Sequence, residues 1–314
     1  MTPLAADDVI LVAGEALFDL VVDGSEHVRA HAGGGPFNTA RTIGRLGQAV
    51  AYLGRISSDG FGTTIERMLG ADGVRLDAVV RTDEPTTLAV AELDATGSAR
   101  YRFYEQGTSA PGLTTRDALA ALPSAVSTLH VGTLGLTFEP VATTVEAVVE
   151  ELSDDAIVVV DPNIRPWAIA DGDAYRRRLA RVLARTHVVK VSEEDIAWLD
   201  PARPALAAAR GLLAAGPTVV LLTRGPDGAV VVTADGDFPV RVPAVEVVDT
   251  IGAGDAFGGG FLAWWRAHGR DADGLAETEA VVEAARFASL VAARTCERAG
   301  ASPPYLSELD PAKT

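Results

Sequence analysis

The chain has 314 residues and a formal net charge of −16, from 27 basic and 43 acidic residues, a balance that repels nucleic acid and anionic membranes and excludes both as partners. Hydrophobic residues make up 48% of the sequence, but no apolar run approaches the roughly 20 residues that span a bilayer. A single cysteine, Cys296, excludes an internal disulfide, and the first residues lack the basic segment of a signal peptide, so we expect a cytoplasmic protein.

Short apolar runs rich in β-branched residues alternate with helix-like segments along the chain. Near-continuous apolarity is typical of strands that are buried on both faces of a parallel sheet. The alternation therefore predicts a doubly wound α/β fold, a mostly parallel sheet sandwiched by helices, as a single domain over 1–314. The predicted strands are 9–14, 50–54, 128–132, 156–161, 187–192 and 218–225, and the predicted helices include 38–47, 139–152 and 174–184.

Two stretches, at about 16–33 and 84–107, break this rhythm. They alternate apolar and polar residues, and the second contains a plausible turn, DATGS, at 94–98. We expect them to form a small β element that stands off the main sheet and acts as a lid. The alternative is an ordinary edge hairpin with no role in binding.

The segment DTIGAGDAFGGGFLAWW (249–265) places a glycine-rich turn before an apolar helix. Gly252 and Gly254 allow successive N–H groups to converge on an anion at the start of that helix. Asp255 stands where a phosphate-binding loop would carry a lysine, and a carboxylate there can take the proton of a hydroxyl that attacks a phosphoryl group. Simple capping of the helix by Asp255 is the alternative, and this motif alone does not decide between them.

A second glycine-rich segment, HAGGGPFNTA, occupies 31–40 and opens another helix. Its glycines would let a polyhydroxylated ligand approach the backbone, and Asn38 offers both a donor and an acceptor. The segment is not a dinucleotide fingerprint, because the spacing G-x-G-x-x-G is absent and Pro36 intrudes.

These two segments resemble the paired signatures of the ribokinase (PfkB) family of carbohydrate kinases, and the order of the elements agrees over almost the whole chain. The resemblance implies a ribokinase-like fold and an ATP-dependent kinase. It implies that Asp255 is the catalytic base and that the amides of the preceding turn form the anion hole. The residues of that turn are Gly252, Ala253 and Gly254.

The resemblance also implies a set of sugar contacts near the N-terminus. Asp19, which follows the first strand, would accept hydrogen bonds from two sugar hydroxyls, and Glu15 is a less favoured substitute for it. The second signature segment would supply the other contacts, at Gly33, Gly34 and Asn38.

For the nucleotide, the resemblance points to the segment LLTRGPDG, which matches a strand and turn of the family. The C-terminal helix would add Ser289, at a position where many members carry asparagine. The implied nucleotide contacts are therefore Thr223, Arg224, Gly225, Gly228 and Ser289.

The segment KVSEEDIAWL departs from the family pattern N-x-x-E, whose glutamate positions Mg²⁺. Asp195 occupies the glutamate position, so Asp195 or the adjacent Glu194 is expected to position Mg²⁺ through water, with Glu193 as a further alternative. Ser192 and Asp195 also form an S-x-x-D helix start. Lys190 in the same segment is expected to be ion-paired or solvated.

A monovalent cation, potassium, is a further implied ligand beside the anion hole. Asp249 and the carbonyl of Ile251 match that site. Pairing of exposed lid faces, which the family uses, implies a homodimer.

The form of two motifs, GGGPFNTA and DPNIRPW, favours the fructokinase branch of the family. D-fructose, phosphorylated at a primary hydroxyl, is then the expected substrate, with Arg165 and Phe103 as further sugar contacts. Strand alternation places Arg102 on the face opposite Phe103, so only one of the two can point at the ligand. A 2-keto-3-deoxygluconate kinase or another sugar or nucleoside kinase is the alternative, and a non-catalytic sugar-responsive regulator is the alternative from a different class.

Overall fold

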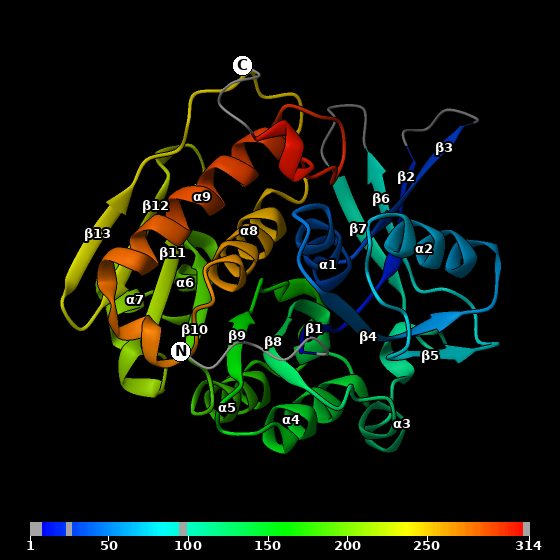
Figure 1. The fold of residues 1–314 in the computed structure, drawn as a ribbon. Helices are drawn as coiled ribbons and strands as arrows, with labels where there is room; N and C mark the ends of the chain where they lie inside the picture. Colours follow the sequence, from blue (N-terminus) through cyan, green and yellow to red (C-terminus); the bar gives the residue numbers. More distant parts are fainter. Residues whose placement is uncertain (1–7, 23–26, 94–98, 310–314) are drawn as a thin grey trace.

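The computed structural model describes residues 8–22, 27–93 and 99–309. Within them, nine strands form the larger sheet (Figure 1). They are β1 (Val9–Ala13), β4 (Val50–Ser57), β5 (Val79–Thr82), β8 (Val126–Gly132), β9 (Ile157–Asp161), β10 (Val188–Ser192), β11 (Val219–Thr223), β12 (Ala229–Thr233) and β13 (Gly236–Val240). Their order across the sheet is β13-β12-β11-β10-β9-β8-β1-β4-β5. All pairings are parallel except those of β12, which is antiparallel to β11 and β13.

Helices cover both faces of this sheet, as Figure 1 shows. One face carries α1 (Gly35–Arg45), α2 (Gly60–Ala71), α8 (Ala253–Ala267) and α9 (Thr278–Cys296). The other carries α3 (Thr115–Ala120), α4 (Val141–Glu151), α5 (Gly172–Leu183), α6 (Glu193–Leu199) and α7 (Ala205–Leu212). Alternate residues of β1 point to the two layers: Ile10 packs in the first and Leu11 in the second. The predicted strands, helices and fold class are confirmed.

The two stretches that break the alternation form a separate sheet with the order β3-β2-β6-β7. Its strands are β2 (Leu17–Val22), β3 (Val28–Gly33), β6 (Leu88–Leu93) and β7 (Ala99–Tyr104). This second sheet stands beside the α1 and α2 end of the main sheet (Figure 1). The predicted turn at 94–98 lies outside the described residues, and the function of the sheet as a lid stays a prediction.

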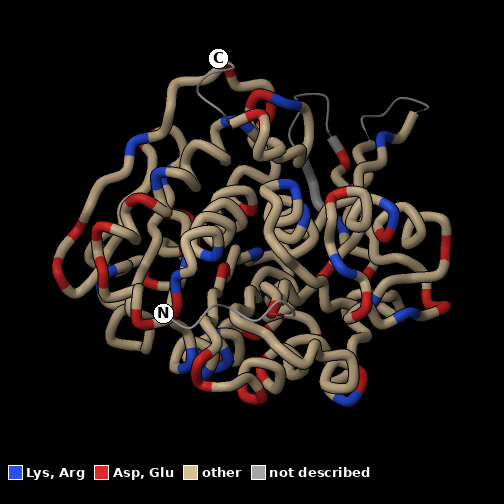
Figure 2. The backbone as a smooth tube through the Cα atoms, in the orientation of Figure 1, with Lys and Arg blue, Asp and Glu red and all other residues tan. Residues whose placement is uncertain are grey.

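Acidic and basic residues are interspersed over most elements (Figure 2), so the negative net charge is spread rather than gathered in one segment. Among the described residues, no helix has both the length and the apolar character that crossing a membrane requires.

The topology brings several connections to one edge of the main sheet. The strand order reverses beside β1, because the chain moves outward through β4 and β5 on one side and through β8 to β13 on the other. Ligands of open α/β sheets bind at such a switch point, outside the carboxyl ends of the strands. Glu15 follows β1 there, Thr133 follows β8 and Asn163 follows β9.

A buried ion cluster ties the C-terminal segment to α1. Asp72, with a side chain only 3% exposed, accepts from Arg41 Nε at 2.6 Å and from Arg45 Nε at 2.9 Å. The hydroxyl of Tyr305 donates to the same carboxylate at 3.2 Å, and Arg41 also donates to the carbonyl of Ala301. Residues more than 200 positions apart are thus held by one carboxylate.

The change Asp72→Ala tests the contribution of this cluster. It leaves two largely buried guanidinium groups without their carboxylate, so we expect the free energy of unfolding to fall by about 3–5 kcal/mol in urea titrations. Asp77→Ala is the matched control, because Asp77 pairs with Arg75 through side chains about half exposed, and such a pair contributes less than about 1 kcal/mol. Equal losses in the two variants would contradict the prediction.

Candidate active site

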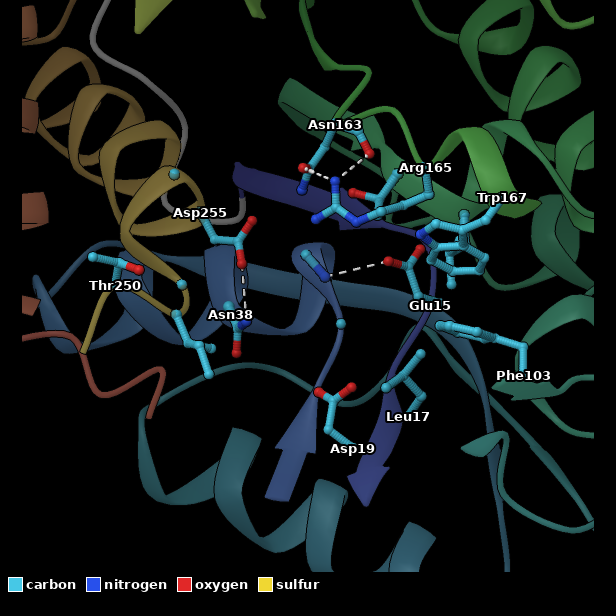
Figure 3. Close-up of a pocket in the computed structure, with 17 residues that line it drawn as sticks. Glu15, Leu17, Asp19, Asn38, Phe103, Asn163, Arg165, Trp167, Thr250 and Asp255 are labelled. Carbon is cyan, nitrogen blue, oxygen red and sulfur yellow. Dashed lines mark hydrogen bonds between the residues drawn. The ribbon is translucent and has the colours of Figure 1, made fainter. Parts of the chain in front are cut away.

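A pocket of about 340 Å³ opens between the carboxyl edge of the main sheet and the second sheet (Figure 3), and its volume lies in the range of small-molecule sites. It is lined by Glu15, Leu17, Asp19, Gly34, Gly35, Asn38, Phe103, Thr133, Leu134, Asn163, Arg165, Trp167, Thr250, Ile251, Gly252, Gly254 and Asp255. The pocket therefore brings together both glycine-rich segments and the motif DPNIRPW.

Asp255 lies in the first turn of α8 and is only 8% exposed. Asn38 Nδ2, from α1, donates to Asp255 Oδ2 at 2.9 Å, as Figure 3 shows. Burial raises the pKa of Asp255 to about 6, although the hydrogen bond from Asn38 lowers it. The group is thus ionised at neutral pH and basic enough to accept a proton.

The turn before Asp255 has the conformation that its glycines allow. Gly252 is left-handed, with φ 77°, and a Cβ at this position would lie 2.5 Å from Cβ of Ala301. Gly252 and Gly254 line the pocket. Ala253, the third residue expected in the anion hole, is not part of the lining. Its N–H already donates to the carbonyl of Thr250 at 3.2 Å. The turn thus presents two glycines to the pocket.

Most of the predicted sugar contacts meet here. Asp19, Gly34, Phe103 and Arg165 all line the pocket together with Asn38. Burial raises the pKa of Asp19 to about 6.

Gly33 is the exception among the predicted sugar contacts, because it is not part of the pocket lining. A Cβ at Gly33 would lie 2.2 Å from Asp19 Oδ2. Gly33 therefore leaves room for the Asp19 carboxylate instead of contacting the pocket.

Glu15 also belongs to the pocket lining, so the structure places both acids considered for the sugar contact, Glu15 and Asp19, in the pocket. The backbone N–H groups of Gly35 and Gly135 each donate to one Glu15 oxygen at 3.2 Å. Burial raises the pKa of Glu15 to about 8, and repulsion by Asp255 adds to this rise.

Several lining residues are absent from the sequence-based prediction. Thr133, with a positive φ of 52°, follows the end of β8. Asn163 accepts from Arg165 Nη1 through its side-chain oxygen at 2.7 Å. The ring of Trp167 stacks on Phe103, with centroids 4.4 Å apart. Their common sequence signal is a position just after a buried strand, where parallel strands present ligand contacts.

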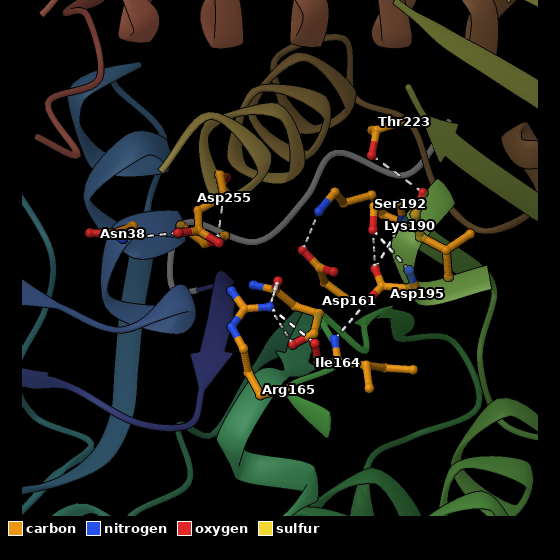
Figure 4. Close-up of polar contacts among 12 residues, drawn as sticks. Asn38, Asp161, Ile164, Arg165, Lys190, Ser192, Asp195, Thr223 and Asp255 are labelled. Atoms are coloured by element: carbon orange, nitrogen blue, oxygen red, sulfur yellow. Dashed lines mark hydrogen bonds and ion pairs between the residues drawn. The ribbon is translucent and has the colours of Figure 1, made fainter. Parts of the chain in front are cut away.

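The residues expected to contact the nucleotide lie outside this lining. Thr223 ends β11, and its hydroxyl donates to the carbonyl of Val191 at 3.3 Å (Figure 4). Arg224 pairs with Glu193 at 3.2 Å, in the turn that continues through Gly225 and Gly228. The remaining predicted contact, Ser289, is buried in α9 with 3% exposure.

Asp195, one of the acids expected to position Mg²⁺ through water, already accepts three hydrogen bonds. Its Oδ1 accepts from the N–H of Ile164 at 2.6 Å, and its Oδ2 accepts from the N–H and the hydroxyl of Ser192, both at 2.9 Å. This is the capping box that the S-x-x-D pattern predicts, so direct coordination by Asp195 does not fit. Glu194 is exposed beside it.

Asp249 joins the two loops that the predicted monovalent-cation site would lie between. Its carboxylate accepts from the N–H of Ile251 at 3.0 Å and from that of Gly300 at 2.8 Å. Among the described residues, no group of three or more histidine, cysteine, aspartate or glutamate side chains could hold a metal ion.

Comparison with known proteins agrees with this geometry. The profile of the pfkB family carbohydrate kinases matches residues 7–308. A fructokinase from Rhizobium leguminosarum bv. trifolii is 36% identical over 81% of this chain and 79% of its own length.

Among solved structures, the ATP-bound fructokinase of Xylella fastidiosa superposes with a TM-score of 0.89 at 30% identity, covering 97% of each chain. The fructokinase of Vibrio cholerae O395 with fructose, ADP and calcium gives 0.84 at 25% identity, over 97% of this chain and 98% of that one.

The fold and the pocket are those of an α/β carbohydrate kinase. The chain belongs to the pfkB family of carbohydrate kinases, which confirms the resemblance that its motifs predicted.

The change Gly252→Ala tests the close approach in the turn before α8. An added Cβ meets both an unfavourable φ of 77° and the side chain of Ala301, so we expect a loss of stability clearly larger than the roughly 1–2 kcal/mol of left-handed strain. Gly47→Ala is the matched control, with the same φ of 77° and no atom within 4 Å of the added Cβ. Urea unfolding of both variants measures the difference, and similar losses would show that Ala301 can move aside.

Proposed function

We propose that the protein transfers the γ-phosphoryl group of ATP to a primary hydroxyl of a neutral sugar, D-fructose. The proposal that the substrate is neutral rests on the charge of the pocket. Its lining holds two carboxylates that are ionised at neutral pH, Asp19 and Asp255, and the mostly protonated Glu15, against the single guanidinium of Arg165. Carboxylates accept hydrogen bonds from hydroxyls, whereas the carboxylate of a sugar acid would be repelled. The fructokinases similar to this chain support the same choice.

Asp255 is the proposed general base. As the sugar hydroxyl attacks, its proton passes to Asp255, a bond forms between the sugar oxygen and the γ-phosphorus, and the bond from that phosphorus to the bridging oxygen of ADP breaks. The glycines of the turn and the N-terminus of α8 face the negative charge of the transferred group. Asn38 holds the carboxylate toward the pocket through its 2.9 Å hydrogen bond.

The second sheet is the proposed lid. Phe103 on β7 stacks on Trp167, which follows β9, so aromatic rings from the two sheets meet at the pocket. Arg102 pairs instead with Glu92 at 3.2 Å, about half exposed, which supports the expected division of β7 into two faces. A closed lid excludes water, which would otherwise compete with the sugar as acceptor.

Mg²⁺ bound with the nucleotide would supply positive charge to the phosphate oxygens. Glu194, which is exposed, fits a contact through water better than the fully engaged Asp195 does. A potassium ion would sit beside the loops that Asp249 joins. The nucleotide would contact Thr223, Arg224 and the turn that follows them. The homodimer and the cytoplasmic location stay predictions.

Asp255→Asn tests the general base. The amide keeps the size of the side chain but cannot accept the proton, so we expect kcat to fall by about 10²–10⁴-fold while ATP affinity stays nearly unchanged. A coupled ADP-release assay and calorimetric titration with ATP measure the two quantities. In the wild type, kcat/KM should fall as the pH drops below about 6, where Asp255 becomes protonated.

Stability gives the control for this variant. A carboxylate whose pKa is raised by folding stabilises the protein below its unfolded pKa, and this contribution is lost as the pH rises through about 6. Asp255→Asn should therefore be at least as stable as the wild type at pH 7.5, with the advantage shrinking toward pH 4. If the variant turns over sugar at a rate comparable to that of the wild type, Asp255 is not the general base.

A sugar panel tests the substrate. We expect kcat/KM for D-fructose to exceed that for 2-keto-3-deoxygluconate by about 100-fold or more, because like charges brought together in the pocket cost several kcal/mol. Asp19→Asn should narrow this ratio by removing one of the repelling carboxylates. A preference for the sugar acid would overturn the fructose proposal. If none of the sugars in the panel supports ADP release, the result would favour a non-catalytic regulator.

A further inference from the structure

Lys190 is one of only two lysines in the chain, and it is buried in β10 with 4% exposure. Its Nζ donates to Asp161 Oδ2 at 2.7 Å, and Asp161 is 2% exposed at the end of β9. The other oxygen of Asp161 has no hydrogen-bond partner among the described residues. Removing an ammonium and a carboxylate from water is costly, so the pair is not explained by stability alone.

The ammonium of Lys190 lies against the turn that begins α8. A Cβ at Gly254 would be only 3.0 Å from Lys190 Nζ, so glycine is what lets the two approach. Figure 4 shows the Lys190–Asp161 contact across from Asp255 at the carboxyl edge of the sheet. A cation is normally unfavourable at the positive N-terminus of a helix. Here the positive charge of the ammonium adds to the partial positive charge at the N-terminus of α8, and both attract an anion placed at the turn.

The charges that face Asp255 come from four parts of the chain. Arg165, which follows β9, and Lys190 on β10 favour its ionised form. Asp161 opposes ionisation, and Glu15 after β1 and Asp255 repel one another. Asn38 on α1 adds a neutral donor. Lys190 is thus one of two cations that balance a pocket rich in carboxylates.

We propose that Lys190 is a positioning residue of the phosphoryl-transfer site, whose ammonium, held by Asp161 against the turn of Gly254, keeps Asp255 ionised and attracts the phosphoryl oxygens. The inference rests on the proposed role of Asp255 as base. The positive charge that a phosphate-binding loop carries as a lysine in its own sequence is here supplied from the neighbouring strand. Asp161 fixes the ammonium, and its own repulsion of Asp255 is larger than the attraction by Lys190, so Asp255 depends on the ammonium to offset that repulsion.

Lys190→Met tests the proposal through the pH profile of kcat/KM for the best sugar of the panel. Without the ammonium, and with Asp161 still present, the acid limb should move to higher pH by about one unit. We expect kcat at pH 7 to fall at least tenfold, with little change in the KM for the sugar. The double variant Lys190→Met/Asp161→Asn removes both charges, so its acid limb should return to that of the wild type or lie at lower pH.

Arg266→Met is the matched control, because Arg266 lies in the last turn of the same helix and pairs with Asp8 at 3.6 Å, with its side chain 13% exposed. It should lose stability without moving the acid limb. An acid limb that stays in place in Lys190→Met, with only stability reduced, would overturn the role of Lys190 and leave a purely structural ion pair.

A wild type that turns over no sugar would overturn the proposed function instead. The affinity for ADP, measured by calorimetry, then decides the electrostatic role of Lys190 independently. Binding about tenfold weaker in Lys190→Met than in the wild type supports the attraction of phosphate oxygens, and equal affinity in the two proteins overturns it.

Discussion

The hydrogen bond from Asn38 to Asp255 is the interaction on which the pocket depends. It joins α1 to the first turn of α8, and the two helices pack on the same face of the sheet through buried residues that include Phe37 and Phe261. The carboxylate is buried at a helix N-terminus, where the aligned backbone dipoles favour its charge. Because both partners sit on rigid helices, the geometry of the acid is set by helix packing rather than by a mobile loop.

Local patterns in the sequence predicted the features whose causes are local. Continuous apolar runs gave the parallel strands, and the S-x-x-D pattern at Ser192 gave an observed capping box. The motif GAGD likewise gave a helix that begins beside Gly252 with Asp255 in its first turn. In each case the pattern lies within a short segment of the chain, so it could be recognised without knowledge of tertiary contacts.

Local sequence patterns did not predict the features that depend on tertiary contacts. Gly33 and Gly34 are adjacent glycines, yet only Gly34 lines the pocket, because Gly33 faces the carboxylate of Asp19 from the opposite strand. Trp167 gains its place by stacking on Phe103 from another sheet. Lys190 was expected to be ion-paired or solvated, and only the fold shows that its ammonium lies against Gly254.

The contacts of α1 with segments far along the chain, including the cluster around Asp72, determine when the pocket can form during synthesis. Asp255 is synthesised 217 residues after its partner Asn38, an interval on the order of ten to forty seconds at typical rates of translation. The carbonyl of Ala301 and the hydroxyl of Tyr305, which complete the bonds to Arg41 and Asp72, emerge later still. A ribosome-bound chain therefore holds the apolar face of α1 without its α8 partner, and the pocket assembles only after α8 has been synthesised.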